Sequence, residues 1–167
     1  MIIFKLLFFT SAFLIFFSLI GYTISMYVLD KIIKRTPKVD LTYRPRVSII
    51  VPAHNEEAVI EKKLDNLCNL NYPLELMEII ISSDNSTDRT NEIVEEYIRK
   101  NPDKPIVLYK VKKRQGKTNA QNEAAKIAKG EILVFSDANS MLDKEAIIHL
   151  VSSFTSDDIV YVCGRLK

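Results

Sequence analysis

The stretch that most constrains the fold runs from Glu78 to Thr90. Its three consecutive isoleucines, 79–81, predict a buried strand, because a strand covered on both faces needs no alternation of polar and apolar residues. The apolar run ends at Asp84, and a cluster of Asn, Ser, Thr and Asp follows, whose short side chains bond free backbone N–H groups at turns and helix starts. Hydrophobic residues then recur at helical spacing as far as Ile98. In an open α/β sheet, ligands bind where such a strand gives way to its loop, so Asp84 is the first candidate site residue.

The same alternation of strands and helices continues along most of the chain. Pro52 is expected to end the first strand, and Gly130 is expected to cap the third helix. The predicted strands are 47–51, 78–83, 106–111, 132–135 and 159–163, and the predicted helices are 56–69, one that follows Asp88, 118–129, and one from 143 or 144 to 154. Strict alternation predicts a mostly parallel sheet with helices on both faces.

The N-terminal part of the chain follows a different pattern. No charged residue occurs from Leu6 to Leu29, and a helix over this stretch would be about 36 Å long, enough to cross the hydrocarbon core of a bilayer. A cleaved signal peptide is the alternative, but it would have a shorter apolar region and a small-residue cleavage site. We therefore predict one transmembrane helix at 1–30.

A basic linker, 31–45, is predicted to follow the helix. The cationic residues just beyond the apolar run face only Asp30 and Asp40 as nearby acids; they are Lys31, Lys34, Arg35, Lys38, Arg44 and Arg46. This bias favours a cytoplasmic location for the rest of the chain, and the same residues can contact anionic membrane lipid. The whole chain carries a net charge of only +2, which does not indicate nucleic acid as a partner. Two isolated cysteines, Cys68 and Cys163, lie within apolar patterns and are expected to be buried rather than paired or metal-bound.

Polar residues follow three of the predicted strands where each strand ends. They are the segment 52–56 after the first strand, Asp84 after the second and the segment 137–139 after the fourth. In a parallel sheet these ends lie on one edge, with Lys117 nearby, and such a group suits a ligand that carries hydroxyls, a base and phosphates. An Asp-x-Asn pair can also present oxygens to Mg²⁺ or Mn²⁺.

These segments together resemble family 2 glycosyltransferases of the GT-A fold. The resemblance covers residues 46–167 and lies in Val47-Ser-Ile-Ile-Val-Pro-Ala-His-Asn-Glu-Glu57, Ser83-Asp-Asn-Ser-Thr-Asp-Arg-Thr90, Gly116-Lys117 and Phe135-Ser-Asp-Ala-Asn139. It implies transfer of a sugar from a nucleotide diphosphate donor, usually a UDP-sugar, to the hydroxyl of a carbohydrate or lipid-linked acceptor. It also implies a role in polysaccharide biosynthesis at the cell envelope.

The resemblance also implies roles for particular residues. Pro52, Ala53 and Glu56 would shape the nucleoside pocket, Asp84 would hydrogen-bond the base, and Lys117 would lie near the nucleotide. Asp137 would be the first acid of the Asp-x-Asp signature. The third signature position is Asn139 rather than Asp, so Asp137 and Asn139 are the expected ligands of a divalent metal, Mg²⁺ or Mn²⁺.

The resemblance places the catalytic general base, an acid downstream of the signature, beyond Lys167. The domain 46–167 is therefore expected to be incomplete at its C-terminal end and to supply the donor-binding half of an enzyme, with a C-terminal partner chain as one source of the rest. A non-catalytic nucleotide-sugar-binding module and a truncated product are alternatives.

A remote alternative is a P-loop-like nucleotidase, suggested by Gly116-Lys117-Thr118. The P-loop pattern needs a glycine at position 111, which is valine. His54 is expected to be a loop histidine with a backbone partner, and His149 an ordinary helix residue. Asp88 and Thr90 are expected to begin a helix rather than to bind a ligand.

Overall fold

A computed structural model describes residues 1–33, 38–156 and 158–164 of the 167-residue chain. The chain forms two compact units, residues 1–37 and 38–167, and each is described by itself below.

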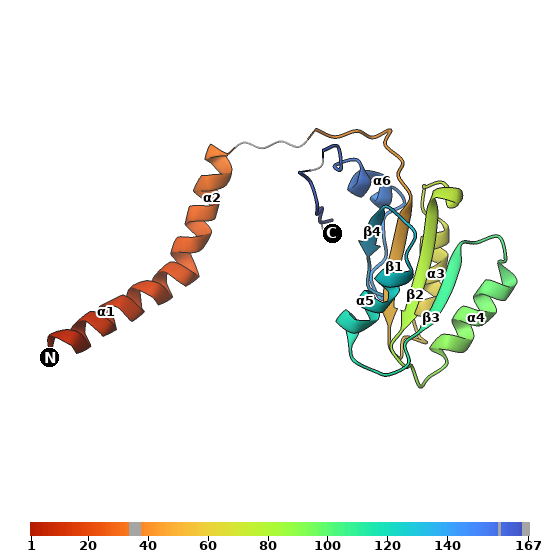
Figure 1. The fold of residues 1–167 in the computed structure, drawn as a ribbon, viewed down its shortest axis with the longest axis horizontal. Coiled ribbons are helices and arrows are strands. Elements are labelled where there is room, and N and C mark those ends of the chain that lie inside the picture. The colour runs from red at the N-terminus through yellow and green to blue at the C-terminus, as the bar shows by residue number, and fades with distance from the viewer. Residues whose placement is uncertain (34–37, 157, 165–167) are drawn as a thin grey trace. The chain divides into compact units, whose positions relative to one another are not determined.

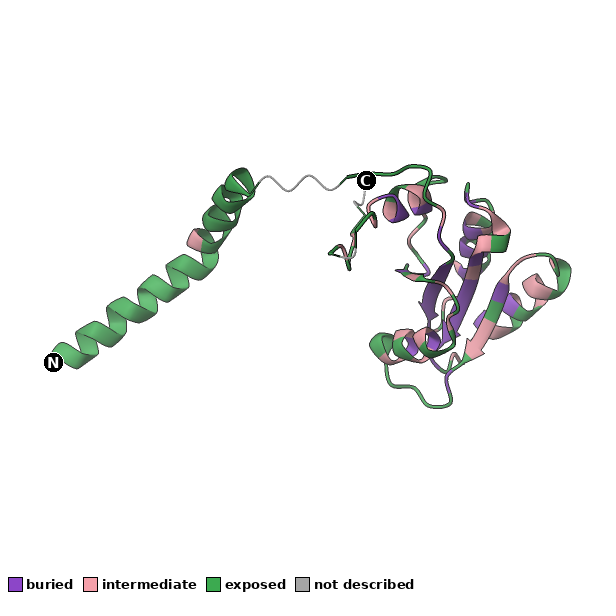
Figure 2. Ribbon diagram, turned by 45° about the horizontal axis from the view of Figure 1, so that its top comes forward, coloured by how far each residue is buried: buried purple, intermediate pink, exposed green. Residues whose placement is uncertain are grey.

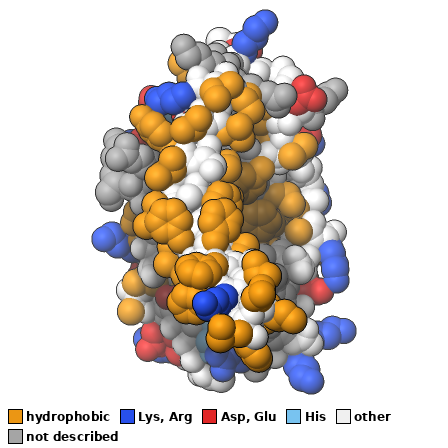
Figure 3. Space-filling model, turned by 90° about the vertical axis from the view of Figure 1, so that its left-hand side faces the viewer, with side chains coloured by type: hydrophobic (Ala, Val, Ile, Leu, Met, Phe, Trp, Pro, Cys, Tyr) orange, Lys and Arg blue, Asp and Glu red, His pale blue; other side chains and the backbone are white. Residues whose placement is uncertain are grey.

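The first unit is a continuous apolar helical segment. It comprises α1 (Ile2–Phe16), a π-helical turn (Phe17–Gly21) and α2 (Tyr22–Ile32). The segment has 31 residues, and an 18-residue window within it has a mean hydropathy of 2.3 and no buried residue. Figure 3 shows exposed hydrophobic side chains, in orange, on the surface turned toward the viewer. By length and composition this helix can cross a membrane, and it coincides with the segment predicted at 1–30. Residues 34–37 of the predicted linker lie outside the described residues.

The second unit is built on a parallel sheet of four strands (Figure 1). The strand order is β3-β2-β1-β4, and every neighbouring pair is parallel, as the alternation predicted. The bounds are β1 (Val47–Ala53), β2 (Met77–Ser83), β3 (Ile106–Lys110) and β4 (Ile132–Phe135). The two central strands, β1 and β2, are almost wholly buried, which explains why they are apolar on both faces (Figure 2).

Helices cover both faces of the sheet, as predicted. The main core lies between one face and three helices, and a smaller core around Ile50, Ile80 and Ala124 lies on the other. The three helices of the main core are α3 (Ile60–Cys68), α4 (Thr90–Lys100) and α6 (Ala146–Val151), whereas α5 (Lys117–Ile127) covers the opposite face. A short 3₁₀ turn (Leu74–Leu76) leads into β2.

The register of the strands determines which residues meet at the carboxyl edge. Ala53 lies beside Ser83, and Ser83 beside Lys110, so β1, β2 and β3 end at the same level. Strand β4 ends earlier, since Phe135 lies beside Ile50. The loops that follow all four strands therefore begin at one edge of the sheet.

The prediction that Pro52 ends the first strand is wrong, because β1 continues to Ala53. The amide of Asp84 donates to the carbonyl of Ala53 on the β2 side, and the amide of Ser136 donates to that of Ile50 on the β4 side. Since successive residues of a strand alternate between their neighbours, position 52 faces the β4 side, where β4 has already ended. No strand carbonyl faces position 52 on that side, so the N–H that proline lacks costs the sheet no hydrogen bond.

Other sequence predictions also differ from the structure. The helices predicted at 56–69 and from 143 or 144 to 154 are shorter, at Ile60–Cys68 and Ala146–Val151. The predicted strand 159–163 is not a strand: Val160 and Tyr161 are 86% and 78% exposed, and a strand forms only where its backbone pairs with a neighbour. Gly130 does not cap α5, which ends at Ile127; instead it packs closely against the backbone of β1. Cys163 is exposed rather than buried, in the same irregular segment, and Cys68 is partly buried.

Candidate functional site

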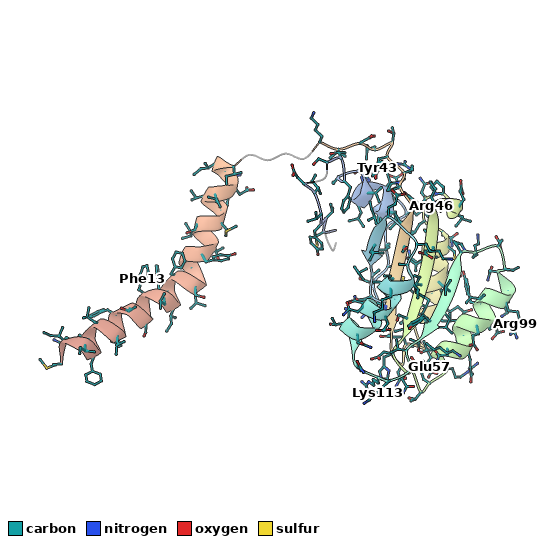
Figure 4. The ribbon with its side chains drawn as sticks, viewed as in Figure 1. Phe13, Tyr43, Arg46, Glu57, Arg99 and Lys113 are labelled. Carbon is teal, nitrogen blue, oxygen red and sulfur yellow. The ribbon has the colours of Figure 1, made fainter. Side chains whose placement is uncertain are left out.

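Hydrogen bonds join the loop after β1 to the loop after β2. The amide of Thr87 donates to Asn55 Oδ1 at 2.8 Å, and that of Arg89 donates to Glu57 Oε2 at 3.0 Å. In the other direction, the amide of Glu57 donates to Asp88 Oδ2 at 3.1 Å. Each loop thus satisfies free N–H groups of the other, and the hydrogen bonds hold the two loops together at the carboxyl edge of the sheet. Figure 4 labels Glu57 and Lys113 at this edge.

Helix α4 begins at Thr90, and Asp88 stands two residues before it, so both lie at the start of the helix as predicted. They also join the two loops. Asp88 Oδ1 accepts hydrogen bonds from the amide and the hydroxyl of Thr90, at 3.0 and 2.6 Å. The Thr90 hydroxyl oxygen in turn accepts from the amide of Glu56 at 2.8 Å. Although desolvation opposes it, hydrogen bonding from Thr90 holds the pKa of Asp88 below its usual value. His54 has the expected backbone partner, since its Nδ1 lies 2.9 Å from the carbonyl oxygen of Asp84.

Asp84 contacts the basic loop that precedes α5, residues 112–116. Its side chain is buried, with only 3% of the residue exposed. One carboxylate oxygen accepts from the amide of Gln115 at 3.1 Å, and the other accepts from that of Gly116 at 2.8 Å. Gly116 has a φ of 91°, a backbone conformation that favours glycine. The acid at the end of β2 therefore fixes the start of α5 and the position of Lys117.

This contact argues against the P-loop alternative. A P-loop cradles phosphate with the free backbone N–H groups at the start of a helix. Here the amides of Gln115 and Gly116 already donate to the carboxylate of Asp84. A negative charge occupies the place where a phosphate would bind, so Gly116-Lys117-Thr118 does not form a phosphate-binding loop.

Lys117 and Asp137 form an ion pair at the same edge of the sheet. The Lys117 Nζ lies 2.6 Å from Asp137 Oδ1, and the two side chains are 57% and 51% exposed. Asn139 is also exposed, whereas Pro52 and Ala53 are buried at the end of β1 and Glu56 is partly buried in the first turn before α3. The predicted residues thus come from four separate segments to one edge, and their exposed members are Lys117, Asp137 and Asn139.

The exposed donors fit a metal that is shared with a phosphate ligand. No cluster of three or more His, Cys, Asp or Glu residues suited to a metal occurs in residues 1–33, 38–156 and 158–164. Asp137 and Asn139 offer one carboxylate and one amide oxygen, which is too few for an all-protein site. It is the usual protein share for Mg²⁺ or Mn²⁺, ions that take further oxygens from substrate phosphates and water.

Sequence reasoning missed a buried lysine at this site. Lys63 lies on the buried face of α3, between the core residues Ile60 and Leu67, and is completely buried. Its Nζ donates to Ser136 Oγ at 2.7 Å and to the carbonyl oxygen of Ser140. Desolvation lowers the pKa of the Lys63 ammonium to about 8, while the carboxylate of Asp137 opposes this shift. The signal was present in the sequence, because Ile60, Lys63, Leu64 and Leu67 have the spacing of one helical face.

The chain is similar to known glycosyltransferases. The probable glycosyltransferase YdaM of Bacillus subtilis is 37% identical over 115 residues, which are 68% of this chain and 27% of that protein. A mannosyltransferase of Pyrobaculum calidifontis, solved with GDP-Man and Mn²⁺, superposes with a TM-score of 0.75 at 33% identity, over 87% of this chain and 44% of that one. Staphylococcus aureus TarS, solved with UDP-GlcNAc, superposes with a TM-score of 0.56 at 31% identity, over 61% of this chain and 29% of that one.

The chain spans less than half the length of each of these relatives. Residues 48–167 match the profile of a family described as Glycosyl transferase family 2. This match covers most of the chain and includes every candidate site residue named above. The chain therefore belongs to glycosyl transferase family 2.

Proposed function

We propose that this chain is the donor-binding part of a membrane glycosyltransferase. It binds a nucleotide diphosphate sugar, with a UDP-sugar as the expected donor, for transfer of the sugar to a carbohydrate or lipid-linked hydroxyl. In this proposal Pro52, Ala53 and Glu56 shape the nucleoside pocket and Asp84 hydrogen-bonds the base. Each carboxylate oxygen of Asp84 accepts one amide and has a second lone pair for such a bond.

The observation that carries the proposal is the ion pair between Lys117 and Asp137. One partner begins α5 and the other follows β4, yet they meet at 2.6 Å at the edge where ligands of open α/β sheets bind. An exposed ion pair contributes only about 0–1 kcal/mol to stability, so stability alone gives little reason for it. A lysine beside a carboxylate suits a diphosphate with its metal ion, since the cation can turn to the phosphates when the metal takes the carboxylate.

The chemistry that follows is stabilisation of the leaving nucleotide. Asp137 and Asn139 would hold Mg²⁺ or Mn²⁺, and the bound ion supplies positive charge to the diphosphate oxygens. Lys117 adds a second positive charge from the protein itself. Asp84 holds the start of α5, and with it Lys117, through two hydrogen bonds before the donor binds, which lowers the ordering cost at that moment.

We propose that the N-terminal helix anchors this chemistry at a membrane. In the proposal the segment 2–32 crosses the bilayer once and the domain that follows lies in the cytoplasm. Support comes from the 31-residue apolar helix, from Lys31 in its last turn and from the cationic residues that follow it, among them Lys38 and Arg44.

Nucleotide binding by the full chain in detergent micelles tests the donor site. We expect isothermal titration calorimetry to show tighter binding of UDP than of ATP, with Mn²⁺ present. Asp137→Ala should weaken UDP binding in Mn²⁺ and have little effect in EDTA. Asn139→Asp should increase the difference between the two conditions, because the added charge strengthens metal binding.

A matched control separates the site from general surface charge. Asp103→Ala removes an exposed carboxylate in the turn before β3, at the opposite edge of the sheet, and should leave binding unchanged. Tighter binding of ATP than of UDP would contradict the donor assignment. Unchanged UDP affinity in Asp137→Ala, with Mn²⁺ present, would contradict the assignment of the metal ligands.

A further inference from the structure

The buried lysine of α3 is unusual enough to need an explanation. Lys63 takes a core position between Ile60, Leu64 and Leu67, which an apolar side chain would ordinarily fill. Burying an ammonium group costs several kcal/mol unless hydrogen bonds and opposite charge offset it. A charge retained at such a place is therefore expected to serve a site rather than the stability of the core.

The two hydrogen bonds of Lys63 bracket the loop that carries the candidate metal ligands. Ser136 and Ser140, the two partners, stand immediately before Asp137 and after Asn139. Between them the loop alternates, with Asp137 and Asn139 exposed and Ala138 buried. The amide of Ser140 also donates to the carbonyl of Asp137 at 3.2 Å, which makes the loop a tight turn. One ammonium group thus holds both ends of this turn from inside.

We propose that Lys63 is a positioning residue for the Ser136–Ser140 loop, fixing Asp137 and Asn139 so that both present oxygens to a divalent cation shared with a nucleotide diphosphate. This inference rests on the function proposed above. Because the loop has one carboxylate and one amide rather than two acids, it has little charge with which to attract a metal. Fixed geometry must then supply more of the affinity, since ordering the ligands in advance lowers the cost of binding.

A positioning role and a purely electrostatic role predict opposite effects. The ammonium of Lys63 is a positive charge near Asp137, and on its own it repels a cation. If charge were its only effect, Lys63→Met would strengthen metal binding. If it positions the loop, the same substitution weakens metal binding, because the two ends of the turn are released.

The experiment measures UDP affinity of the full chain in detergent, with Mn²⁺ and with EDTA. For Lys63→Met we expect affinity in Mn²⁺ to fall about tenfold, the equivalent of about 1.4 kcal/mol, with a change below about twofold in EDTA. Lys62→Met is the matched control, because Lys62 is the exposed neighbour on the same helix. Ser136→Ala keeps the lysine and removes one of its two acceptors, and should lose about threefold in Mn²⁺.

Hydrogen exchange of segment 136–142 provides a readout besides nucleotide binding. Lys63→Met and Ser136→Ala should speed exchange there and leave segment 84–90 unchanged. Equal or tighter Mn²⁺-dependent binding in a folded Lys63→Met protein would overturn the proposal. If Lys63→Met does not fold, unchanged Mn²⁺ dependence and exchange in Ser136→Ala would overturn it. Wild-type protein that binds no nucleotide in either condition would instead refute the proposed function, and this inference with it.

Discussion

Replacing Asp84 with alanine should loosen the loop before α5. The wild-type carboxylate accepts two backbone N–H groups, at 3.1 and 2.8 Å, and a hydrogen bond to a charged group contributes about 1.5–3 kcal/mol. The full sum is not lost, because Gln115 and Gly116 are exposed and water can replace the carboxylate once the loop moves. Removing the buried charge also removes its desolvation cost. We therefore expect the free energy of unfolding to fall by about 2 kcal/mol.

Two measurements on the full chain in detergent test this reasoning. Urea unfolding gives the loss of stability, and hydrogen exchange with mass spectrometry shows where the protection is lost. Exchange should speed up in segment 112–120 and stay unchanged in the turn 101–105. Asp103→Ala is the control and should change stability by less than about 0.5 kcal/mol. Wild-type protection of segment 112–120 in Asp84→Ala would refute the idea that Asp84 holds the start of α5.

Gly116, Lys63 and the N-terminal helix each lead to one further prediction. Gly116→Ala should lower the free energy of unfolding by about 1 kcal/mol, measured by urea unfolding, because φ is 91° although the space beside it is open; an unchanged value would contradict this. The free energy of unfolding of the wild type, minus that of Lys63→Met, should rise by about 1–2 kcal/mol as the pH increases from 8 to 10. Burial lowers the pKa of Lys63 from 10.5 to about 8, so in this range the unfolded chain binds a proton that the folded chain lacks; a decrease in urea unfolding experiments would contradict this. The chain should stay with membranes after alkaline carbonate washing, and protease should digest residues beyond 46 only in inside-out vesicles; recovery in the soluble fraction would contradict this.

Much of the fold could be predicted because it depends on local patterns. The apolar runs of β1 and β2 and the helical spacing of α4 identified central strands and a covering helix, and strict alternation then required a parallel sheet. The stretch 159–163 has a similar apolar pattern and yet forms no strand. A strand needs a partner as well as a pattern, and partners are set by the tertiary structure rather than by the local sequence.

The site could be predicted less completely, because long-range contacts decide what each residue does. The position of Asp84 at the end of β2 marked it as a candidate site residue, but no local pattern indicates that Gln115 and Gly116 donate to it. Lys63 had a readable signal in its core-facing position, although its partners lie more than 70 residues away. Motifs therefore identified the exposed residues of the edge, whereas the buried residues that hold them required the structure.

The two lysines of the edge differ in a way that bears on the proposed function. Lys117 is more than half exposed, so its ion pair with Asp137 is worth little and can break at low cost when a diphosphate arrives. Lys63 is completely buried, and breaking its hydrogen bonds would leave an unpaired charge in the core, which costs far more. One cation can thus exchange partners while the other stays fixed. On the proposed function, Lys117 moves to the ligand and Lys63 keeps the loop of Asp137 and Asn139 in place during that exchange.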